Sequence, residues 1–130
     1  MPQSSPKVLS QAERIARIAG LNDGLRRAIH SLGRDQVVMT ASVAALIGDV
    51  ALFRGFHRRA EIIRMVRDYE SFTPDNDPLG EHDFGRFEFD GTILYWKIDY
   101  YDLALAYGSP DPANPEITTR LLTILRAEDY

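Results

Sequence analysis

The sequence predicts an α+β protein in which two long N-terminal helices pack on an antiparallel sheet that contains a central Asp-Gly hairpin. Three observations predict this class. Apolar residues recur at three- and four-residue steps in the first half, strand-like segments flank Asp90-Gly91 in the second half, and the 130 residues contain no linker or internal repeat. We expect residues 1–9, which include two prolines, to form a loose tail and residues 10–130 to form a single α+β domain.

The first long helix is predicted to begin at Ser10, because Ser10 and Glu13 have the spacing of a capping box. Asn22 interrupts the apolar stripe of this helix, so a break near residues 21–24 is an open alternative. Gly33 is a typical residue at which a helix stops. The stripe itself consists of Ile15, Ile18, Leu25, Ile29 and Leu32.

Three further elements are expected before residue 71. The β-branched segment Gln36–Met39 indicates a buried strand, and Thr40 is placed to cap a short helix over residues 41–47. A second long helix is predicted from about Leu52 to Glu70. Its expected core face consists of Leu52, Phe56, Ile63 and Val66, and its opposite side carries Arg54, Arg58, Glu61 and Arg64.

The hairpin is the clearest local pattern in the second half. Arg86–Phe89 and Thr92–Trp96 flank Asp90-Gly91, which is a favoured pair for a two-residue type I′ turn. In this register Phe87 faces Leu94. Turn-rich segments lie on both sides of the hairpin, at residues 71–82 and 100–115. Residues 117–127 fit either a helix or a strand, and a helical turn followed by a strand is favoured.

Charge is divided unevenly along the chain. Residues 1–67 carry eleven Lys/Arg and five Asp/Glu, whereas residues 68–130 carry four and fourteen, within a net charge of −4. Either the two halves neutralise each other after folding, or one face presents charge of a single sign to a partner. The absence of cysteine excludes disulfides, thiol nucleophiles and thiolate metal sites. No segment reads as a membrane span or a signal peptide, so we expect a cytoplasmic protein without membrane contact.

A catalytic cluster is one interpretation of the hairpin register. Extended past the turn, the register places His82 opposite Asp99 and near Lys97, where a His–Asp pair could act as a base. Under this interpretation Mg²⁺ or Mn²⁺ would be held by Asp77, Glu81, His82 and Asp99. The structural alternative is that residues 77–80 form a type I turn and that His82 is only a cross-strand neighbour of Asp99.

A protein-binding surface is the competing interpretation of the same half of the chain. Tyrosines beside acidic groups are typical of protein contact surfaces, and carboxylates repel nucleic-acid phosphates. The candidate partner-binding residues are Asp75, Asp77, Glu81, Asp83, Tyr100, Tyr101, Asp102 and Asp111. Direct nucleic-acid binding would instead use Arg54, Arg58, Arg64 and Arg67. We do not expect it, because the net charge opposes it and such helix faces are commonly solvated and internally paired.

Several longer segments carry a family resemblance. They are residues 73–78 (TPDNDP), 80–85 (GEHDFG), 96–102 (WKIDYYD) and 108–112 (GSPDP), together with residues 21–23 and the C-terminal residues. From about Ile15 to Tyr130 the chain resembles a family of small bacterial proteins of unknown function that are typically encoded on plasmids and integrative elements. The resemblance implies a cytoplasmic accessory protein of mobile DNA, and it implies no catalytic residue.

The sequence therefore favours a non-enzymatic protein that needs no cofactor. Its partner would be a basic nucleic-acid-handling enzyme, such as a host defence or restriction protein that the acidic half inhibits. The alternative is a small metal-assisted hydrolase or nuclease built on the cluster around His82 and Asp99.

Overall fold

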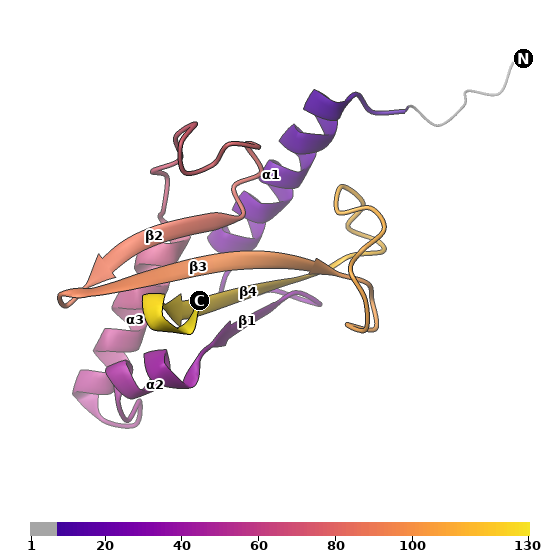
Figure 1. The fold of residues 1–130 in the computed structure, drawn as a ribbon. Helices are drawn as coiled ribbons and strands as arrows, with labels where there is room; N and C mark the ends of the chain where they lie inside the picture. Colours follow the sequence, from indigo (N-terminus) through magenta and orange to yellow (C-terminus); the bar gives the residue numbers. More distant parts are fainter. Residues whose placement is uncertain (1–7) are drawn as a thin grey trace, which may run out of the picture.

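Helices occupy the first half of the chain and strands dominate the second half in the computed structural model, which describes residues 8–130 (Figure 1). In chain order the elements are α1 (Gln11–Arg27), β1 (Gln36–Met39), α2 (Ala41–Ile47), α3 (Phe53–Arg67), β2 (Phe84–Phe89), β3 (Thr92–Tyr101), β4 (Thr119–Arg126) and the short 3₁₀ helix η1 (Ala127–Asp129). Most of the loose tail predicted over residues 1–9 lies outside the described residues.

The four strands form one mixed sheet in the order β1-β4-β3-β2. The prediction of a wholly antiparallel sheet with a central hairpin is therefore wrong in two respects. β1 pairs in parallel with β4, with Gln36 opposite Leu121, and β2 lies at an edge of the sheet. Both differences arise because the last strand of the chain inserts between β1 and β3, a long-range pairing that no local pattern encodes.

Strands β2 and β3 pair antiparallel, with Phe87 opposite Leu94 and Phe89 opposite Thr92. Asp90 and Gly91 lie between the paired ends with φ angles of 50° and 75°. These are the left-handed backbone conformations that Asp-Gly adopts with little strain. Beyond the paired strand, the Ile98 N–H still donates to the Asp83 carbonyl at 2.8 Å.

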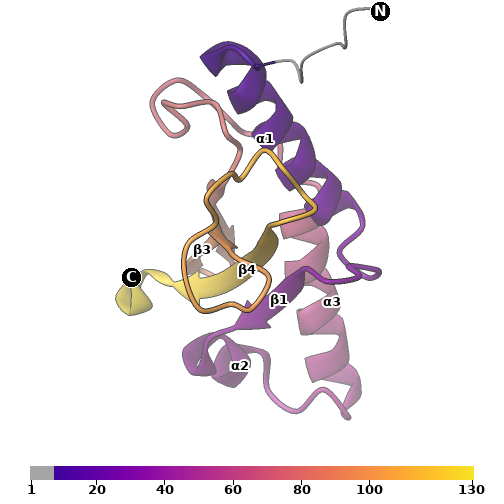
Figure 2. The same cartoon turned by 90° about the vertical axis from the view of Figure 1, so that its right-hand side faces the viewer.

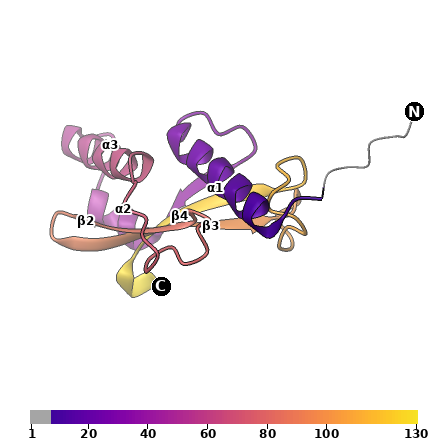
Figure 3. The same cartoon turned by 90° about the horizontal axis from the view of Figure 1, so that it is seen from above.

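Helices α1 and α3 cover one face of the sheet, so the fold has two layers (Figure 3). Alternate residues of β3 point toward these helices, and Leu94, Trp96 and Ile98 are buried among them. In the view of Figure 2, β1 lies next to β4 and forms the edge of the sheet opposite β2. On the other face of the sheet, the ring of Tyr130 packs against Phe84 and Tyr95.

The two-helix description also needs correction. Within residues 8–130 there are three α-helices, since the short helix predicted over residues 41–47 is confirmed as α2 between α1 and α3, and α1 ends at Arg27 rather than near Gly33. α1 begins as predicted, with the Glu13 N–H donating to Ser10 Oγ at 3.1 Å. It continues through residues 21–24 without a break, because the Asn22 side chain finds buried partners.

The predicted core face of α3 is wrong at its N-terminal end. Leu52 and Phe56 are exposed, whereas Gly55, Ile62 and Val66 are buried. Gly55 explains why the buried face of α3 is rotated about the helix axis from the predicted one, since a Cβ at this position would collide with the Asp49 carbonyl group. The absence of a side chain lets the α2–α3 connection approach the helix closely, and the larger apolar residues of the first turn then face outward.

The C-terminal segment forms a turn at residues 115–117, and β4 follows it. Of the two structures that residues 117–127 could adopt, the favoured strand is therefore confirmed. Buried residues of β4 include Leu122, Ile124 and Leu125. Within residues 8–130, no helix is both long enough and apolar enough to cross a membrane.

Candidate functional site

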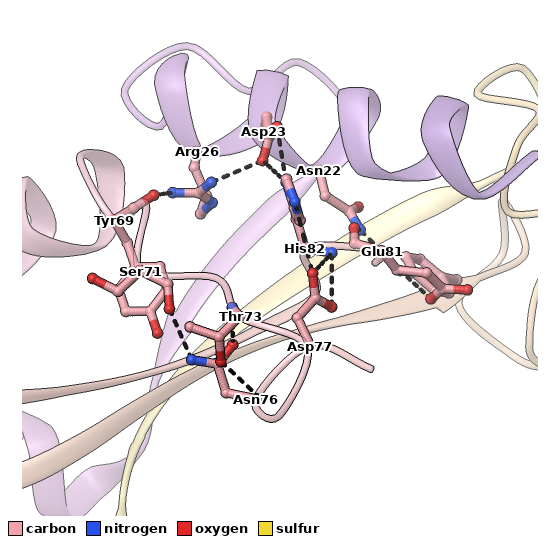
Figure 4. Close-up of polar contacts among 11 residues, drawn as sticks. Asn22, Asp23, Arg26, Tyr69, Ser71, Thr73, Asn76, Asp77, Glu81 and His82 are labelled. Atoms are coloured by element: carbon pink, nitrogen blue, oxygen red, sulfur yellow. Dashed lines mark hydrogen bonds and ion pairs between the residues drawn. The ribbon is translucent and has the colours of Figure 1, made fainter. Parts of the chain in front are cut away.

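The segment before β2 is fastened to α1 through His82. The His82 Nδ1 atom lies 2.9 and 3.1 Å from the two carboxylate oxygens of Asp23, in the C-terminal half of α1 (Figure 4). The imidazole stacks on the Phe72 ring with the two ring centroids 4.0 Å apart and the planes nearly parallel. His82 adopts a φ of 57°, so the chain turns here instead of continuing as a strand.

Asp77 holds His82 from the other side. Its carboxylate accepts the His82 backbone N–H at 3.3 Å, and Oδ2 lies 3.7 Å from His82 Nε2. The predicted turn forms, since the Gly80 N–H donates to the Asp77 carbonyl at 3.0 Å. The Thr73 N–H donates to the Asn76 side chain at 2.8 Å, which stabilises the start of the same loop. These contacts hold the loop in one shape.

The contacts of His82 with Asp23 and Asp77 form what we call the clamp. Arg26 joins this clamp to α3. Its Nη2 donates to Asp23 Oδ1 at 2.9 Å, and its Nη1 donates to the carbonyl groups of Val66 at 3.1 Å and Tyr69 at 2.7 Å. The carbonyl groups at a helix C-terminus lack partners within the helix, and a guanidinium satisfies them while matching the negative end of the helix dipole. The same guanidinium lies 4.8 Å from the centre of the Trp96 ring. Asp23 therefore accepts from both Arg26 and His82.

Asn22, which is fully buried, is the centre of a second network. Its Nδ2 donates to Tyr100 Oη at 2.8 Å and to the Glu81 carbonyl at 3.0 Å, and its Oδ1 accepts from Arg120 Nε at 2.8 Å. The Tyr100 hydroxyl donates to Glu81 Oε2 at 3.1 Å. Burial, together with the nearby carboxylates of Asp83 and Glu81, raises the pKa of Tyr100 and outweighs the Asn22 hydrogen bond. Tyr100 is therefore a neutral hydrogen-bonding residue.

Arg120 is a buried cation that is held by neutral groups. Its guanidinium donates to Asn22 and to the Pro112 carbonyl, and it lies 5.2 Å from the centre of the Tyr100 ring. Desolvation lowers the pKa of Arg120, against the attraction of Tyr100, Asp35 and Glu81. The network therefore joins α1, the loop before β2, β3 and β4 at one end of the sheet.

The catalytic cluster predicted from the hairpin register does not form as predicted. His82 pairs with Asp23 rather than with Asp99, because its left-handed backbone turns the residue out of the strand. Lys97 and Asp99 contact each other at 3.3 Å, and alternation along β3 places both on the face of the sheet away from the helices. His82 lies on the helix side. His82, Lys97 and Asp99 are thus divided between two faces.

The candidate metal ligands are likewise separated. Asp77 bonds to His82, Glu81 accepts from Tyr100, and Asp99 pairs with Lys97. In the described part of the chain, no three His, Asp or Glu side chains are grouped so that they could hold a metal ion. The side chains of this cluster position a loop, and no hydroxyl or thiol nucleophile lies among the hydrogen-bond partners of His82.

The candidate partner-binding residues fall into two groups. Asp77, Glu81 and Tyr100 belong to the internal networks, and Asp111 forms an ion pair with Arg14 at 2.8 Å. Asp75 is exposed, and Asp83, Tyr101 and Asp102 are partly exposed.

Asp83 has the most unusual environment of this second group. Desolvation raises the pKa of its carboxyl, and the charges of Glu81, Asp77 and Asp99 raise it further, while a backbone hydrogen bond lowers it. Among residues 8–130, Asp83 forms no ion pair that would offset this repulsion. Asp83 is therefore a partly buried carboxylate in a field of like charge.

Most of the arginines considered as nucleic-acid contacts are engaged within the protein. Three of them form ion pairs: Arg58–Asp90, Arg64–Glu61 and Arg67–Asp68. Arg58 in addition donates to the Leu46 carbonyl at 3.1 Å and lies over the Phe89 ring, so it is a packing residue rather than a solvated one. The fourth, Arg54, is exposed.

A cavity of about 330 Å³ lies beside the clamp. Asp23, Arg26, Phe72 and His82 line it, together with Arg67 near the end of α3. The polar atoms of Asp23 and Arg26 already bond to each other, and the charged side chains of Arg27 and Glu70 also line the cavity.

The sequence interpretation missed four residues that carry the two networks: Asn22, Asp23, Arg26 and Arg120. Asn22 gave the only signal, because a polar residue on an otherwise apolar stripe indicates a buried hydrogen-bonding centre as well as a break. The partners of Asn22 lie 59 to 98 residues away in the sequence. No local spacing could have identified them.

No curated protein and no solved structure matches the chain. A family model described as "Protein of unknown function (DUF3768)" matches residues 39–129, which include α2, α3, the loop before β2 and strands β2 to β4, but only the last residue of β1 and none of α1. The match begins later than the resemblance expected from Ile15 onward, so Asn22, Asp23 and Arg26 lie outside it. Because it spans more than half of the chain, the protein belongs to the DUF3768 family.

Proposed function

We propose that this protein binds a basic protein partner through an acidic surface at the end of β3 and the loop before β2. The observation that carries the proposal is the environment of Asp83, a partly buried carboxylate surrounded by like charges and without an ion pair in the described chain. An unpaired carboxylate in this setting costs stability, and a cation supplied by a partner would remove that cost.

Neighbouring side chains extend this acidic surface. Asp75 lies exposed in the loop before β2, and Asp102 follows directly after β3. Tyr101 is partly exposed beside Asp102 and supplies the aromatic surface that is common at protein contacts. A partner with clustered Lys and Arg would meet both charge and aromatic area here.

The metal-assisted hydrolase is the weaker candidate, because the side chains that it requires are engaged in separate contacts. His82 is held between Asp23 and Asp77, and Asp99 lies on the other face of the sheet. We therefore assign the loop contacts a structural role in presenting Asp75 and Asp83.

The nature of the partner follows from charge. Enzymes that handle nucleic acid carry basic surfaces that match phosphate, and an acidic protein can occupy such a surface in its place. We propose a basic host defence or restriction enzyme as the target, with this protein acting as a non-enzymatic inhibitor in the service of mobile DNA.

Affinity capture tests this proposal. Wild-type protein is immobilised beside the double variant Asp75→Asn/Asp83→Asn, which removes two charges of the acidic surface, and each is exposed to a lysate of the source organism. We expect the wild type to retain a basic nucleic-acid enzyme that is released as salt is raised, and the variant to retain much less of it.

The matched control is Glu88→Gln/Glu128→Gln, which removes the same number of charges from exposed positions outside the acidic surface. Equal retention by this control and the wild type places the contact at the acidic surface. Equal loss in both variants would reduce the effect to net charge, and failure of the wild type to retain any basic nucleic-acid enzyme would refute the proposal.

A further inference from the structure

A second exposed surface lies at the start of α3. Four apolar side chains in the α2–α3 connection and the first turn of α3 are largely exposed: Val50 at 50%, Leu52 at 63%, Phe53 at 80% and Phe56 at 60%. We call these four residues the apolar corner. Isolated exposed apolar residues are normal, but a contiguous group of this size is typical of an interaction site.

The apolar corner adjoins a groove between the end of α2 and the start of α3. The groove has a volume of about 260 Å³ and shares Leu52 with the corner. Leu46 and Ile47 contribute its apolar wall. A groove of this size accepts one or two apolar side chains of a ligand.

The cations around the apolar corner define the charge of the ligand. Arg54, His57 and Arg59 are exposed, whereas the one carboxylate that lines the groove, Asp49, accepts the Ala51 N–H at 2.9 Å. Arg54 and Arg59 form no ion pair within the described residues. His57 packs against the Phe53 ring, with the ring centroids 4.2 Å apart, and so sits within the apolar surface.

We propose that the apolar corner binds an amphipathic segment of another protein that carries both apolar and acidic side chains. The apolar side chains of this segment would fill the groove beside Leu52 and cover Phe53 and Phe56. Its carboxylates would pair with Arg54 and Arg59, for which a planar carboxylate is a suitable partner.

Three other occupants fit this surface less well. A second copy in a two-fold contact would bring Arg54 and Arg59 of both chains together, which like-charge repulsion opposes. Binding of a nucleic acid or an anionic membrane commonly depends on roughly four to ten cationic side chains. The apolar corner is flanked by two arginines and one histidine, which is fewer.

The apolar corner is independent of the acidic surface. In Figure 1 the start of α3 lies at the lower left, next to α2, whereas the end of β3 lies at the right of the molecule. A basic partner on the acidic surface and an acidic segment on the apolar corner can therefore bind at the same time. Failure of one proposal leaves the other standing.

Peptide selection tests the inference. A phage-displayed library of random 12-residue peptides is selected on the immobilised full-length protein, and an enriched peptide is titrated by fluorescence anisotropy. We expect enriched sequences to combine apolar or aromatic residues with Asp or Glu. The Phe53→Ser/Phe56→Ser variant should weaken binding by about tenfold or more, as expected when central aromatic anchors are removed.

Two further variants make the result specific. Arg54→Gln/Arg59→Gln should weaken binding several-fold and reduce its salt dependence, because it removes only the charged contacts. Leu79→Ser/Leu103→Ser removes equally exposed leucines elsewhere and should leave binding unchanged. Both arginine substitutions change exposed side chains without ion pairs, so this variant tests the proposal even if the phenylalanine variant does not fold.

Several outcomes would overturn the inference. These are enriched peptides that lack acidic residues, binding that is unchanged in both the phenylalanine and the arginine variants, or a selection that enriches nothing. Binding of phosphatidylserine vesicles or of a thymidine oligonucleotide in preference to the peptides, or dimerisation lost with Phe53→Ser/Phe56→Ser, would assign the surface to a different occupant.

Discussion

His82 Nδ1 lies 2.9 Å from Asp23 Oδ1, and this contact joins the loop before β2 to α1 across 59 residues of sequence. The same carboxylate accepts from Arg26, which in turn satisfies the C-terminal carbonyl groups of α3. One aspartate thus connects a loop and two helices. The loop that this clamp fixes also contains Asp75 and leads into Asp83, so the clamp determines where the acidic surface is presented.

Removal of the Asp23 carboxylate should cost more stability than removal of the His82 imidazole. Asp23→Asn leaves the buried Arg26 charge without its partner, whereas His82→Asn loses mainly one hydrogen bond and a ring contact. We expect losses of about 2–4 kcal/mol and about 1 kcal/mol respectively, measured by urea denaturation. Equal losses, or a larger loss for His82→Asn, would contradict the assignment of Asp23 as the centre of the clamp.

Asn22→Leu should destabilise the protein although it completes the apolar stripe of α1. Leucine cannot replace the hydrogen bonds to Tyr100, Glu81 and Arg120, so buried polar groups lose their partners. The expected loss is roughly 2–4 kcal/mol in the free energy of unfolding. A neutral or stabilising effect in chemical denaturation would mean that the network contributes little.

Two glycine-to-alanine substitutions should change stability in opposite directions. A Cβ at Gly85 would collide with the Trp96 indole on the paired strand, so Gly85→Ala should cost about 1–3 kcal/mol. Gly20, within α1, has open space around it, and Gly20→Ala should add about 0.5–1 kcal/mol through helix propensity. Thermal unfolding of both variants checks the pair, and a midpoint for Gly85→Ala at or above the wild-type value would refute the packing argument.

Asp83→Asn should raise stability at neutral pH. Burial and neighbouring carboxylates raise the pKa of Asp83 in the folded state, so the folded protein holds this proton more tightly than the unfolded chain does. Ionisation of Asp83 therefore lowers the free energy of unfolding. This loss of stability is absent below the ordinary carboxyl pKa, grows as pH rises through the folded-state pKa and is complete above it. Thermal midpoints of variant and wild type should therefore differ at pH 7 and converge at about pH 3. A midpoint at pH 7 that is lower in the variant would contradict the assignment.

Local elements were predictable because their signals are local. The cap at Ser10, the strand pairing around Phe87 and Leu94, and the turn ending at Gly80 all depend on neighbouring residues or on a short register. The parallel pairing of β1 with β4 was not predictable, since it joins residues about 85 positions apart, such as Gln36 and Leu121. The exposed face of α3 was missed because Gly55 carries no apolar signal.

The candidate site was predicted only in part. The extended hairpin register holds as far as Asp83, whose carbonyl accepts the Ile98 N–H, but it fails at His82, a single left-handed residue. Because the backbone turns there, the His82 side chain pairs with Asp23 instead of Asp99. The choice depends on how α1 packs over the loop, which is a tertiary property that spacing along the chain does not contain.

The most direct test of the account follows Asp83→Asn in two assays on the same protein. Residues that serve a binding site often cost stability in the free protein. We expect the thermal midpoint of Asp83→Asn at pH 7 to rise above that of the wild type, and its retention of the basic partner from lysate to fall. A variant that gains stability and retains the partner fully would show that the carboxylate of Asp83 has no part in binding, and would contradict the proposed acidic surface.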